Sequence, residues 1–440
     1  MSVPVKVAGS NSRSAKPGSC PNLSQMARTS PTSFAGSTLY GWLVSPYTAK
    51  VRAMLAYKHI PFHDVSPSVS EMFLSLKPAV GRPIMPSVKL ADGQWRQDSA
   101  LICDEIEASH PERPTQPSGP TQRLASSLLE LHGDEWLPMV ALHYRWNMPQ
   151  NKEWAVREFG RTGFPWLPEL ISSRLAAPFA QKMQSFKRVQ GIGPETIPGI
   201  ESFATQLIST LNTHLAEHDF LLGSAPCRGD FSLYGPLWAH LFRDPASRPL
   251  FDGAPHVVRW FERLHGHESD ATFPQAATRA ASPPGAAAPA ALFLRSDEVP
   301  ATLDPIFRTL FAEQWPFLAS LSRTIDEHLE RPEADGRVPR AFGFAPFAVG
   351  GASGERRLVT FQAWKMHRVL HQYAALALAP SRALELSAVD RWLERLGGGA
   401  REAVATLRPR ARLEREAKLP AAQDVLRAVA EGGPGPSSRL

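Results

Sequence analysis

The sequence predicts an α/β domain, then an all-α domain, then a mainly helical extension. Residues 37–114 alternate between strand-like and helix-like runs in the order β-α-β-α-β-β-α. From Thr121 onward, apolar residues recur at helical spacing. A segment rich in Ala, Pro and Gly at 268–290 reads as a linker to further helical runs. With 440 residues, the chain is long enough for two or three domains.

The charge distribution argues against a nucleic-acid partner. The chain has a formal net charge of +6. Residues 1–36 and 391–440 each carry +4, which leaves −2 for the residues between them. The predicted domains are therefore close to neutral, and the basic residues gather at the ends of the chain. No run of 18 apolar residues occurs, so we also expect no membrane partner.

The cysteines and histidines predict neither disulfides nor a metal site. Cys20, Cys103 and Cys227 lie far apart and lack the spacing of metal ligands. The histidines at positions 63, 132 and 143 have no metal-binding partner at a useful spacing. An odd and sparse set of cysteines is typical of a reducing compartment. We therefore expect a cytoplasmic protein.

The first unit, 37–114, is built from short elements. The predicted strands are 37–44, 60–65, 83–90 and 95–97, and the predicted helices are 49–58, 70–77 and 100–107. Asp98 and Ser99 are suited to cap the last of these helices.

Pro86 is unusual inside a strand, because proline cannot donate a hydrogen bond to a neighbouring strand. An edge strand would explain it. A cis bond between Met85 and Pro86 is the sharper alternative, since it would turn the Met85 backbone outward to pair with an extended peptide.

The turn Ser45-Pro46-Tyr47-Thr48 has the spacing of a C-P-Y-C redox site with hydroxyls in place of both thiols. Redox chemistry by the chain itself at this turn is excluded, because exchange requires a thiolate. A helix that begins here presents N–H groups and partial positive charge to an anion. Ser45 either donates a hydrogen bond to such an anion or acts as an ordinary N-cap. Tyr40, Tyr47 and Thr48 are rival hydroxyls.

The second domain, 118–267, is predicted to be helical throughout, and the extension spans 291–397. Asp230 follows Cys227 at the spacing of a capping box, although Ser or Thr would suit the first position better. In the second domain we expect helices at 122–144, 153–159, 168–189, 200–218, 237–242 and 257–264. In the extension we expect helices at 305–329, 355–378 and 388–396, with a turn-rich strip at 340–349.

The two ends of the chain lack the pattern of a folded domain. Residues 1–36 are rich in Ser, Pro and Gly without any acid, and they predict a disordered leader. A targeting segment or a true start at Met26 are the alternatives. Residues 398–440 predict a basic, partly disordered tail.

Four local motifs, in order, resemble the cytosolic glutathione transferases over residues 37–266. Ser45-Pro46-Tyr47 followed by Lys50-Val51-Arg52 resembles the start of that family's first helix. Met85-Pro86 resembles its cis-proline strand, and Asp98-Ser99 resembles the acid-serine pair that opens its third helix. Cys227 to Phe231 resembles its S-x-x-D-F cap, with Cys in place of Ser or Thr.

The resemblance implies a thioredoxin-like N-terminal domain, an all-α transferase domain and glutathione as co-substrate. Ser45 would hydrogen-bond the glutathione thiolate, while Met85, Pro86, Asp98 and Ser99 would bind the peptide. The implied substrate wall consists of Tyr47, Tyr144 and Trp146, although packing is the competing explanation for the tryptophans. A small electrophile is the implied partner, and a homodimer is possible.

Residues beyond 291 are not part of a standard transferase and resemble C-terminal extensions of longer bacterial members. Two other functions stay open. One is a glutathione-binding or scaffold protein without turnover, and the other is a glutathione-dependent oxidoreductase, against which the hydroxyls of Ser45 and Thr48 argue.

Overall fold

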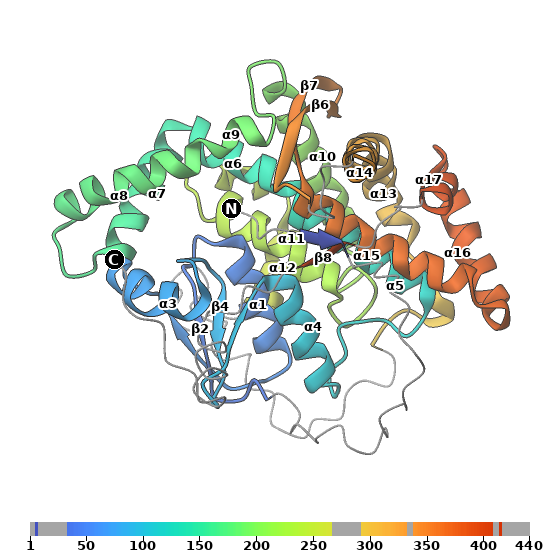
Figure 1. Cartoon of the computed structure of the whole chain (residues 1–440), viewed down its shortest axis with the longest axis horizontal. Helices are drawn as coiled ribbons and strands as arrows, with labels where there is room; N and C mark the ends of the chain where they lie inside the picture. Colours follow the sequence, from blue (N-terminus) through green and yellow to red (C-terminus); the bar gives the residue numbers. More distant parts are fainter. Residues whose placement is uncertain (1–4, 8–32, 266–291, 332–337, 408–412, 416–440) are drawn as a thin grey trace.

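The structure is a computed structural model that describes residues 5–7, 33–265, 292–331, 338–407 and 413–415. Figure 1 shows the N-terminal α/β domain (blue) below a large helical body, with the arm of α7 and α8 reaching to one side. The predicted linker at 268–290 lies outside the described residues, as do most of the predicted leader and tail.

The N-terminal domain is a four-stranded sheet with helices, as the sequence predicts. The strands lie in the order β3-β2-β4-β5, with β2 parallel to β3 and the other pairs antiparallel. Helices α1 and α4 pack against each other, and apolar side chains such as Leu39, Val51 and Ile102 are fully buried between sheet and helices. The bounds are β2 (Ser37–Tyr40), α1 (Pro46–Tyr57), β3 (Phe62–Val65), β4 (Ser87–Lys89), β5 (Trp95–Gln97) and α4 (Ser99–Ser109).

The predicted irregular helix after β3 is a chain of three short pieces. Ser68 caps it, and the Glu71 carboxylate accepts a hydrogen bond from the Ser68 backbone N–H at 2.7 Å. The pieces are α2 (Val69–Glu71), a π-helical turn η2 (Met72–Leu76) and α3 (Lys77–Val80). Gly81 ends the segment with a φ of 75°, a conformation that glycine adopts without steric cost.

The second domain is all-helical, but the single helix expected over 122–144 is wrong. Two helices replace it and meet at Trp136, because Pro138 has no N–H to continue the hydrogen-bond ladder of the first. The bounds are α5 (Pro120–Glu135), α6 (Leu137–Asn147), α7 (Pro149–Gly163), α8 (Glu169–Gln184), α9 (Phe186–Val189), α10 (Ile197–His214), α11 (Arg228–Pro236), η3 (Leu237–Phe242), η4 (Arg248–Phe251) and α12 (Pro255–Leu264).

The capping box predicted before α11 is formed by Asp230. Its carboxylate accepts hydrogen bonds from the Cys227 N–H at 2.8 Å, the Leu221 N–H at 3.1 Å and Trp260 Nε1 at 2.9 Å. One buried carboxylate therefore joins the start of α11 to the preceding loop and to α12.

The extension contains a β-hairpin that the sequence reading missed. The turn-rich strip expected at 340–349 is the strand β6 (Ala341–Val349), and the helix expected from 355 begins only at Thr360. Between them lies β7 (Ala352–Val359). Gly350 and Gly351 have φ values of 54° and 85°, which suit a tight hairpin turn. In Figure 1 the hairpin (orange) stands between α10 and α14, and β7 also packs on α9.

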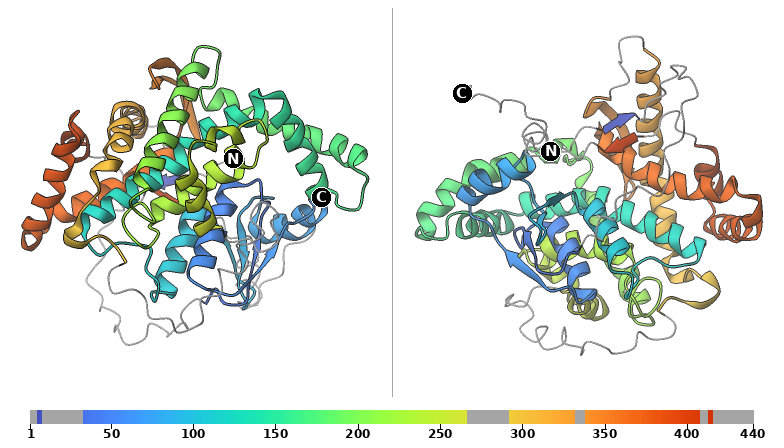
Figure 2. Two further views of the ribbon diagram at one scale, coloured as in Figure 1. Left: turned by 180° about the vertical axis from the view of Figure 1, so that it is seen from behind. Right: turned by 60° about the horizontal axis from the view of Figure 1, so that its bottom comes forward.

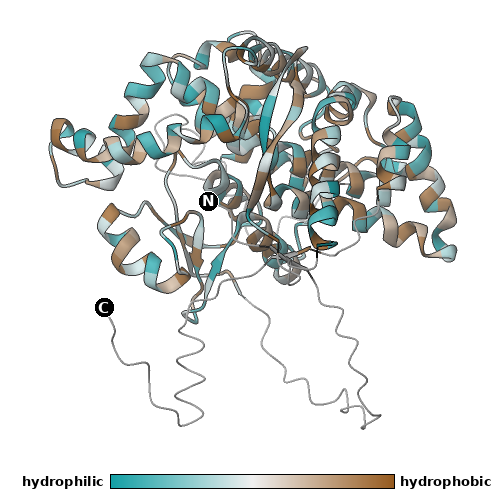
Figure 3. Cartoon of the chain, turned by 45° about the horizontal axis from the view of Figure 1, so that its top comes forward, coloured by the Kyte–Doolittle hydropathy of each residue, from teal (hydrophilic) through white to brown (hydrophobic). Residues whose placement is uncertain are grey.

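The remaining elements up to residue 397 are helical, as predicted. They are η6 (Arg295–Asp297), η7 (Ala301–Leu303), α13 (Asp304–Thr309), η8 (Leu310–Gln314), α14 (Trp315–Leu329), α15 (Thr360–Ala377), η10 (Pro380–Arg382) and α16 (Ala383–Leu396). Helix α17 (Ala400–Thr406), by contrast, lies within the residues 398–440 that were expected to form a partly disordered tail. In Figure 3, hydrophobic and hydrophilic segments alternate along the outer helices, as expected where one helix face meets solvent.

The extension packs directly on the second domain. Helices α15 and α16 lie against α5, and one continuous buried cluster runs through all three units. The Asp297 carboxylate accepts hydrogen bonds from the N–H groups of Thr121 at 2.7 Å and Gln122 at 2.9 Å. A residue of the extension therefore caps α5, where Gly119 offers no side chain.

Two short strands correct the expectation of disorder at the chain ends. β1 (Val5–Val7) lies within the predicted leader and pairs antiparallel with β8 (Leu413–Arg415), within the predicted tail. Figure 2 (right) shows the pair side by side, in blue and red. Local sequence could not reveal the pairing, because each three-residue strand depends on a partner at the other end of the chain. Within the described residues, no helix is long and apolar enough to cross a membrane.

Candidate active site

A cavity of about 470 Å³ lies where the two domains and the extension meet. The N-terminal domain contributes the first turn of α1, the loop before β4 and the start of α4, while the second domain contributes the end of α5 and helix α9. The extension contributes the hairpin and α15. The lining residues are Tyr47, Ile84, Met85, Pro86, Asp98, Ser99, Asp134, Glu135, Phe186, Val189, Gln190, Arg340, Ala341, Arg357, Val359, Phe361, Gln362 and Lys365.

Met85 and Pro86 reach this cavity at a cis peptide bond, the sharper of the two alternatives. The edge-strand alternative is wrong, because β4, which follows, is paired on both sides by β2 and β5. Ser87 Oγ donates a hydrogen bond to the Ile84 carbonyl at 2.9 Å across the bend.

Asp98 and Ser99 line the cavity and also open α4, so the sequence placed this pair correctly on a helix start. Asp98 Oδ1 accepts hydrogen bonds from the N–H groups of Ala100 at 2.9 Å and Leu101 at 3.2 Å. The Asp98 backbone has a φ of 80°, a left-handed conformation that non-glycine residues rarely adopt. Such strain often marks a functional position, because surrounding contacts must hold it.

Ser45 begins α1 as an N-cap, and its Oγ accepts a hydrogen bond from the Thr48 N–H at 3.3 Å. Ser45 is half-buried and stands just before Tyr47, although it is not itself among the residues that line the cavity. Accepting from Thr48 leaves the hydroxyl proton of Ser45 available to a ligand.

The rival hydroxyls are less suited to a ligand. Tyr47 donates its hydroxyl proton to the Asp134 carbonyl at 3.1 Å, and burial raises its pKa well above the usual range. Thr48 is fully buried beneath Gly41, where an added Cβ would lie 2.3 Å from the threonine Oγ1. Tyr40 stacks on Trp95 with ring centroids 5.3 Å apart, outside the cavity lining.

The expected substrate wall of Tyr47, Tyr144 and Trp146 is right in position only for Tyr47. Tyr144 and Trp146 are 5% and 4% exposed and belong to packed clusters away from the cavity lining. Trp146 therefore serves core packing, which was the alternative to a place in the substrate wall. Phe186 and Phe361 supply the other aromatic rings of the cavity, one from a short helix and one from the extension.

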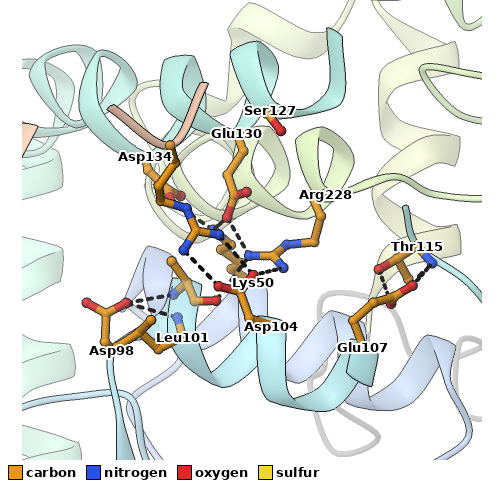
Figure 4. Close-up of polar contacts among 12 residues, drawn as sticks. Lys50, Asp98, Leu101, Asp104, Glu107, Thr115, Ser127, Glu130, Asp134 and Arg228 are labelled. Atoms are coloured by element: carbon orange, nitrogen blue, oxygen red, sulfur yellow. Dashed lines mark hydrogen bonds and ion pairs between the residues drawn. The ribbon is translucent and has the colours of Figure 1, made fainter. Parts of the chain in front are cut away.

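A network of charges adjoins the cavity at Asp134, and Figure 4 shows its members from the first two domains. Lys50 Nζ on α1 contacts Glu130 and Asp134 on α5, each at 2.7 Å. Arg228 on α11 contacts Glu130 at 2.6 Å and Asp104 on α4 at 2.8 Å.

The extension closes this network from its other side. Lys365 on α15 donates to Asp134, and Arg368 contacts Asp104 at 2.7 Å. Burial disfavours ionisation of Asp134, but Lys365 and Lys50 outweigh it and hold its pKa below the usual range. The network therefore fixes the position of α15, which contributes Phe361, Gln362 and Lys365 to the cavity lining.

Glu135 is the one carboxyl of the cavity lining that combines burial with an unpartnered oxygen. It is 7% exposed, and Oε1 has no hydrogen-bond partner. Burial raises its pKa to about 7, with Asp134 adding to the shift and Lys365 and Arg356 opposing it. Sequence reasoning missed Glu135, Gln362 and Lys365, and no motif marks them, because two of them come from an extension whose packing only the fold defines.

The comparisons with known families support the architecture. Residues 39–114 match the glutathione S-transferase N-terminal domain, and residues 204–268 match the glutathione S-transferase C-terminal domain. The chain therefore carries both the N-terminal and the C-terminal domain of the glutathione S-transferases. Neither match extends into the residues after 268, so the extension stands outside both family models. No curated protein matches the sequence.

Solved structures with similarity to the chain include three bacterial proteins. A beta-etherase from Sphingobium sp. strain SYK-6 is 18% identical with a TM-score of 0.36, covering 55% of this chain and 99% of its own. A glutathione S-transferase from Methylobacterium radiotolerans, in complex with glutathione sulfonate, is 19% identical with a TM-score of 0.34, covering 55% and 94%. FzlA from C. crescentus is 17% identical with a TM-score of 0.36, covering 58% and 97%. We base the domain assignment on the two family models.

Among the described residues, no group of three or more His, Cys, Asp or Glu side chains is placed to hold a metal ion. Cys103 and Cys227 are both free and buried, and burial raises the pKa of the Cys103 thiol to about 11. Neither thiol lies at the turn before α1.

Proposed function

We propose that the protein is a glutathione transferase that activates the thiolate of bound glutathione for attack on a small electrophile. The observation that carries the proposal is that the pairs Met85-Pro86 and Asp98-Ser99, separated in sequence by β4 and β5, line one cavity beside the start of α1. The backbone at Met85 would pair with the peptide, and the start of α4 would bind the γ-glutamyl group. We also propose that the protein is cytoplasmic and that it forms a homodimer.

Ser45 is the proposed catalytic residue in this scheme. A thiol has an ordinary pKa of about 8.5, so little thiolate is present at pH 7 without help. The Ser45 hydroxyl would donate a hydrogen bond to the sulfur, and the partial positive charge at the N-terminus of α1 would add to the stabilisation. A preorganised donor of this kind contributes about 2–4 kcal/mol in the transition state.

The experiment compares two serines that make the same cap. Ser45→Ala and Ser68→Ala each remove an N-cap hydroxyl that accepts a backbone N–H at 3.3 Å. Ser45 begins α1, whose Tyr47 lines the cavity, whereas Ser68 caps α2, which contributes no lining residue. Conjugation is measured with an aryl halide, an epoxide and an α,β-unsaturated ketone, together with retention on immobilised glutathione.

We expect the wild type to be retained and to conjugate at least one electrophile. Ser45→Ala should lose turnover by about 100-fold or more, while Ser68→Ala should keep it. Equal rates in the two variants would remove Ser45 from the chemistry. Retention without any conjugation would favour the binding or scaffold alternative, and reduction of a disulfide substrate that depends on Ser45 would favour the oxidoreductase.

A further inference from the structure

Two acceptor atoms at the cavity lack any donor. Glu135 Oε1 and Gln362 Oε1 are both buried without a hydrogen-bond partner, and both residues line the cavity. The side chains come from different units, Glu135 from the end of α5 and Gln362 from α15 of the extension. An unsatisfied buried acceptor costs about 1–3 kcal/mol, so such a pair is expected only where a ligand or water completes it.

Neither nearby cation contacts the Glu135 carboxylate directly, although Arg356 Nη1 is itself buried without a partner and its charge lowers the pKa of Glu135. Lys365 donates to Asp134. Arg356 donates to the Glu135 backbone carbonyl at 2.7 Å and to Gln190, and its guanidinium lies 4.8 Å from the centre of the Trp136 ring. Gln362 Nε2 also points to the Glu135 carbonyl, at 3.4 Å. Glu135 Oε1 and Gln362 Oε1 are thus left for a ligand inside the cavity, while a hydrogen bond from the Gln362 side chain also lowers the pKa of Glu135.

The two unpartnered oxygens of Glu135 and Gln362 determine which chemical group of a ligand would bind there. An ionised carboxylate and an amide carbonyl both accept hydrogen bonds and cannot donate through these oxygens. A protonated amine supplies several N–H donors and a compensating charge, and its bonds to a carboxylate are among the stronger hydrogen bonds. Arg340 and Arg357 also line the cavity and suit an anionic group of the same ligand.

We propose that Glu135 and Gln362 form a subsite for a protonated amine, so that the extension completes the cavity as a binding site. The amine has two possible sources. One is the α-amino group of glutathione's γ-glutamyl residue, and this source rests on the proposed function. The other is an amine on the second substrate, bound beside glutathione.

The test uses the full chain and two independent variants. Glu135→Gln removes the charge with little change of shape, and Gln362→Met removes the amide oxygen from the extension side. Glu313→Gln is the matched control, because burial also raises the pKa of Glu313 to about 7 and Glu313 Oε2 is also unpartnered, yet it does not line this cavity. Thermal unfolding of each variant checks that it is folded.

Titration calorimetry at pH 8 then measures three ligands: glutathione, its analogue without the α-amino group, and n-butylamine in the presence of saturating glutathione. If glutathione supplies the amine, the wild type should prefer it to the deaminated analogue by about tenfold or more. Glu135→Gln and Gln362→Met should lose that preference, while Glu313→Gln keeps it. If the second substrate supplies the amine, n-butylamine should bind the wild type and the control but neither cavity variant.

The outcomes separate the two proposals. A preference or amine binding that survives in both cavity variants overturns the subsite and leaves the glutathione transferase proposal intact. Binding of n-butylamine that depends on Glu135, with no binding of glutathione, supports the subsite and overturns the transferase proposal. Binding of none of the three ligands contradicts both and indicates that water alone fills the position.

Discussion

Asp134 is the residue whose loss should destabilise the assembly of domains most clearly. Its carboxylate is 2% exposed and contacts two lysines from different units, Lys50 of α1 and Lys365 of α15. Lys50 keeps Glu130 as a second partner, but Lys365 has no other carboxylate partner among the described residues. Replacing Asp134 therefore leaves a buried ammonium without its counter-charge.

The magnitude follows from what remains after Asp134→Asn. Removing one partner of a buried ion pair costs about 3–5 kcal/mol, because the other charge stays desolvated. The asparagine oxygen still accepts a hydrogen bond, which recovers about 1 kcal/mol. The expected loss is about 2–4 kcal/mol, a large share of the roughly 5–15 kcal/mol by which native proteins are stable.

Urea unfolding at pH 7 measures this loss, followed by tryptophan fluorescence and far-ultraviolet circular dichroism in parallel. Coincident transitions are needed before a single free energy is assigned to so large a chain. Glu385→Gln is the control, since it makes the same carboxylate-to-amide change in an exposed pair with Arg382 and should leave the midpoint unchanged.

A double-mutant cycle tests whether the loss of stability comes from the Asp134–Lys365 pair. Lys365→Met removes the stranded ammonium, so the double variant with Asp134→Asn should be more stable than the sum of the single effects by about 1–3 kcal/mol. A loss below about 1 kcal/mol in Asp134→Asn, or strictly additive single effects, would refute the reasoning that this buried pair fixes the extension.

Three further predictions concern other buried positions. Asp230→Ala should destabilise the chain by about 3 kcal/mol or more in urea unfolding, because it strands three buried donors; a loss no larger than that of an exposed Asp→Ala change would contradict this. Gly235→Ala places a Cβ 2.4 Å from the Pro46 carbonyl oxygen and should cost about 1–3 kcal/mol, whereas Gly253→Ala, with nothing within 4 Å, should cost far less in the same assay. The pKa of Glu135, about 7 when folded, lies above its ordinary value of 4.5, so the folded chain binds the extra proton and loses stability as pH rises through that window. Glu135→Gln has no carboxyl proton to lose, so its free energy of unfolding should rise relative to that of the wild type by on the order of 3 kcal/mol between pH 4.5 and pH 8. A constant difference in stability between the two proteins across that range would disprove the prediction.

Local sequence rules located the N-terminal site elements because each rests on neighbouring residues. Asp98 caps the helix that follows it within three residues, and Ser45 does the same for α1. Proline's lack of an N–H singled out Met85-Pro86 before any fold was known. The hairpin of the extension was missed, since the expectation of turns at 340–349 gave no weight to a pairing partner across Gly350 and Gly351.

The site also contains members that no local rule could find. Tyr144 and Trp146 looked suitable for a substrate wall by residue type, yet they are packed in the interior, while Phe186 and Phe361 line the cavity. Aromatic composition does not specify which face of a helix meets a cavity. That depends on how α6, α9 and α15 pack against their neighbours.

The sequence by itself determined the order of elements in the N-terminal domain, the resemblance of two domains to the glutathione transferases and the starts of α1 and α4, because capping, proline geometry and helical spacing act over a few residues. Only the tertiary structure decided that the extension folds back onto α5 and that Gln362 and Lys365 join Glu135 at the cavity. Those contacts span more than 200 residues of chain. They exist because burying apolar faces of α15 and α16 and pairing the buried carboxylate of Asp134 with Lys365 are favourable only once all three units are assembled.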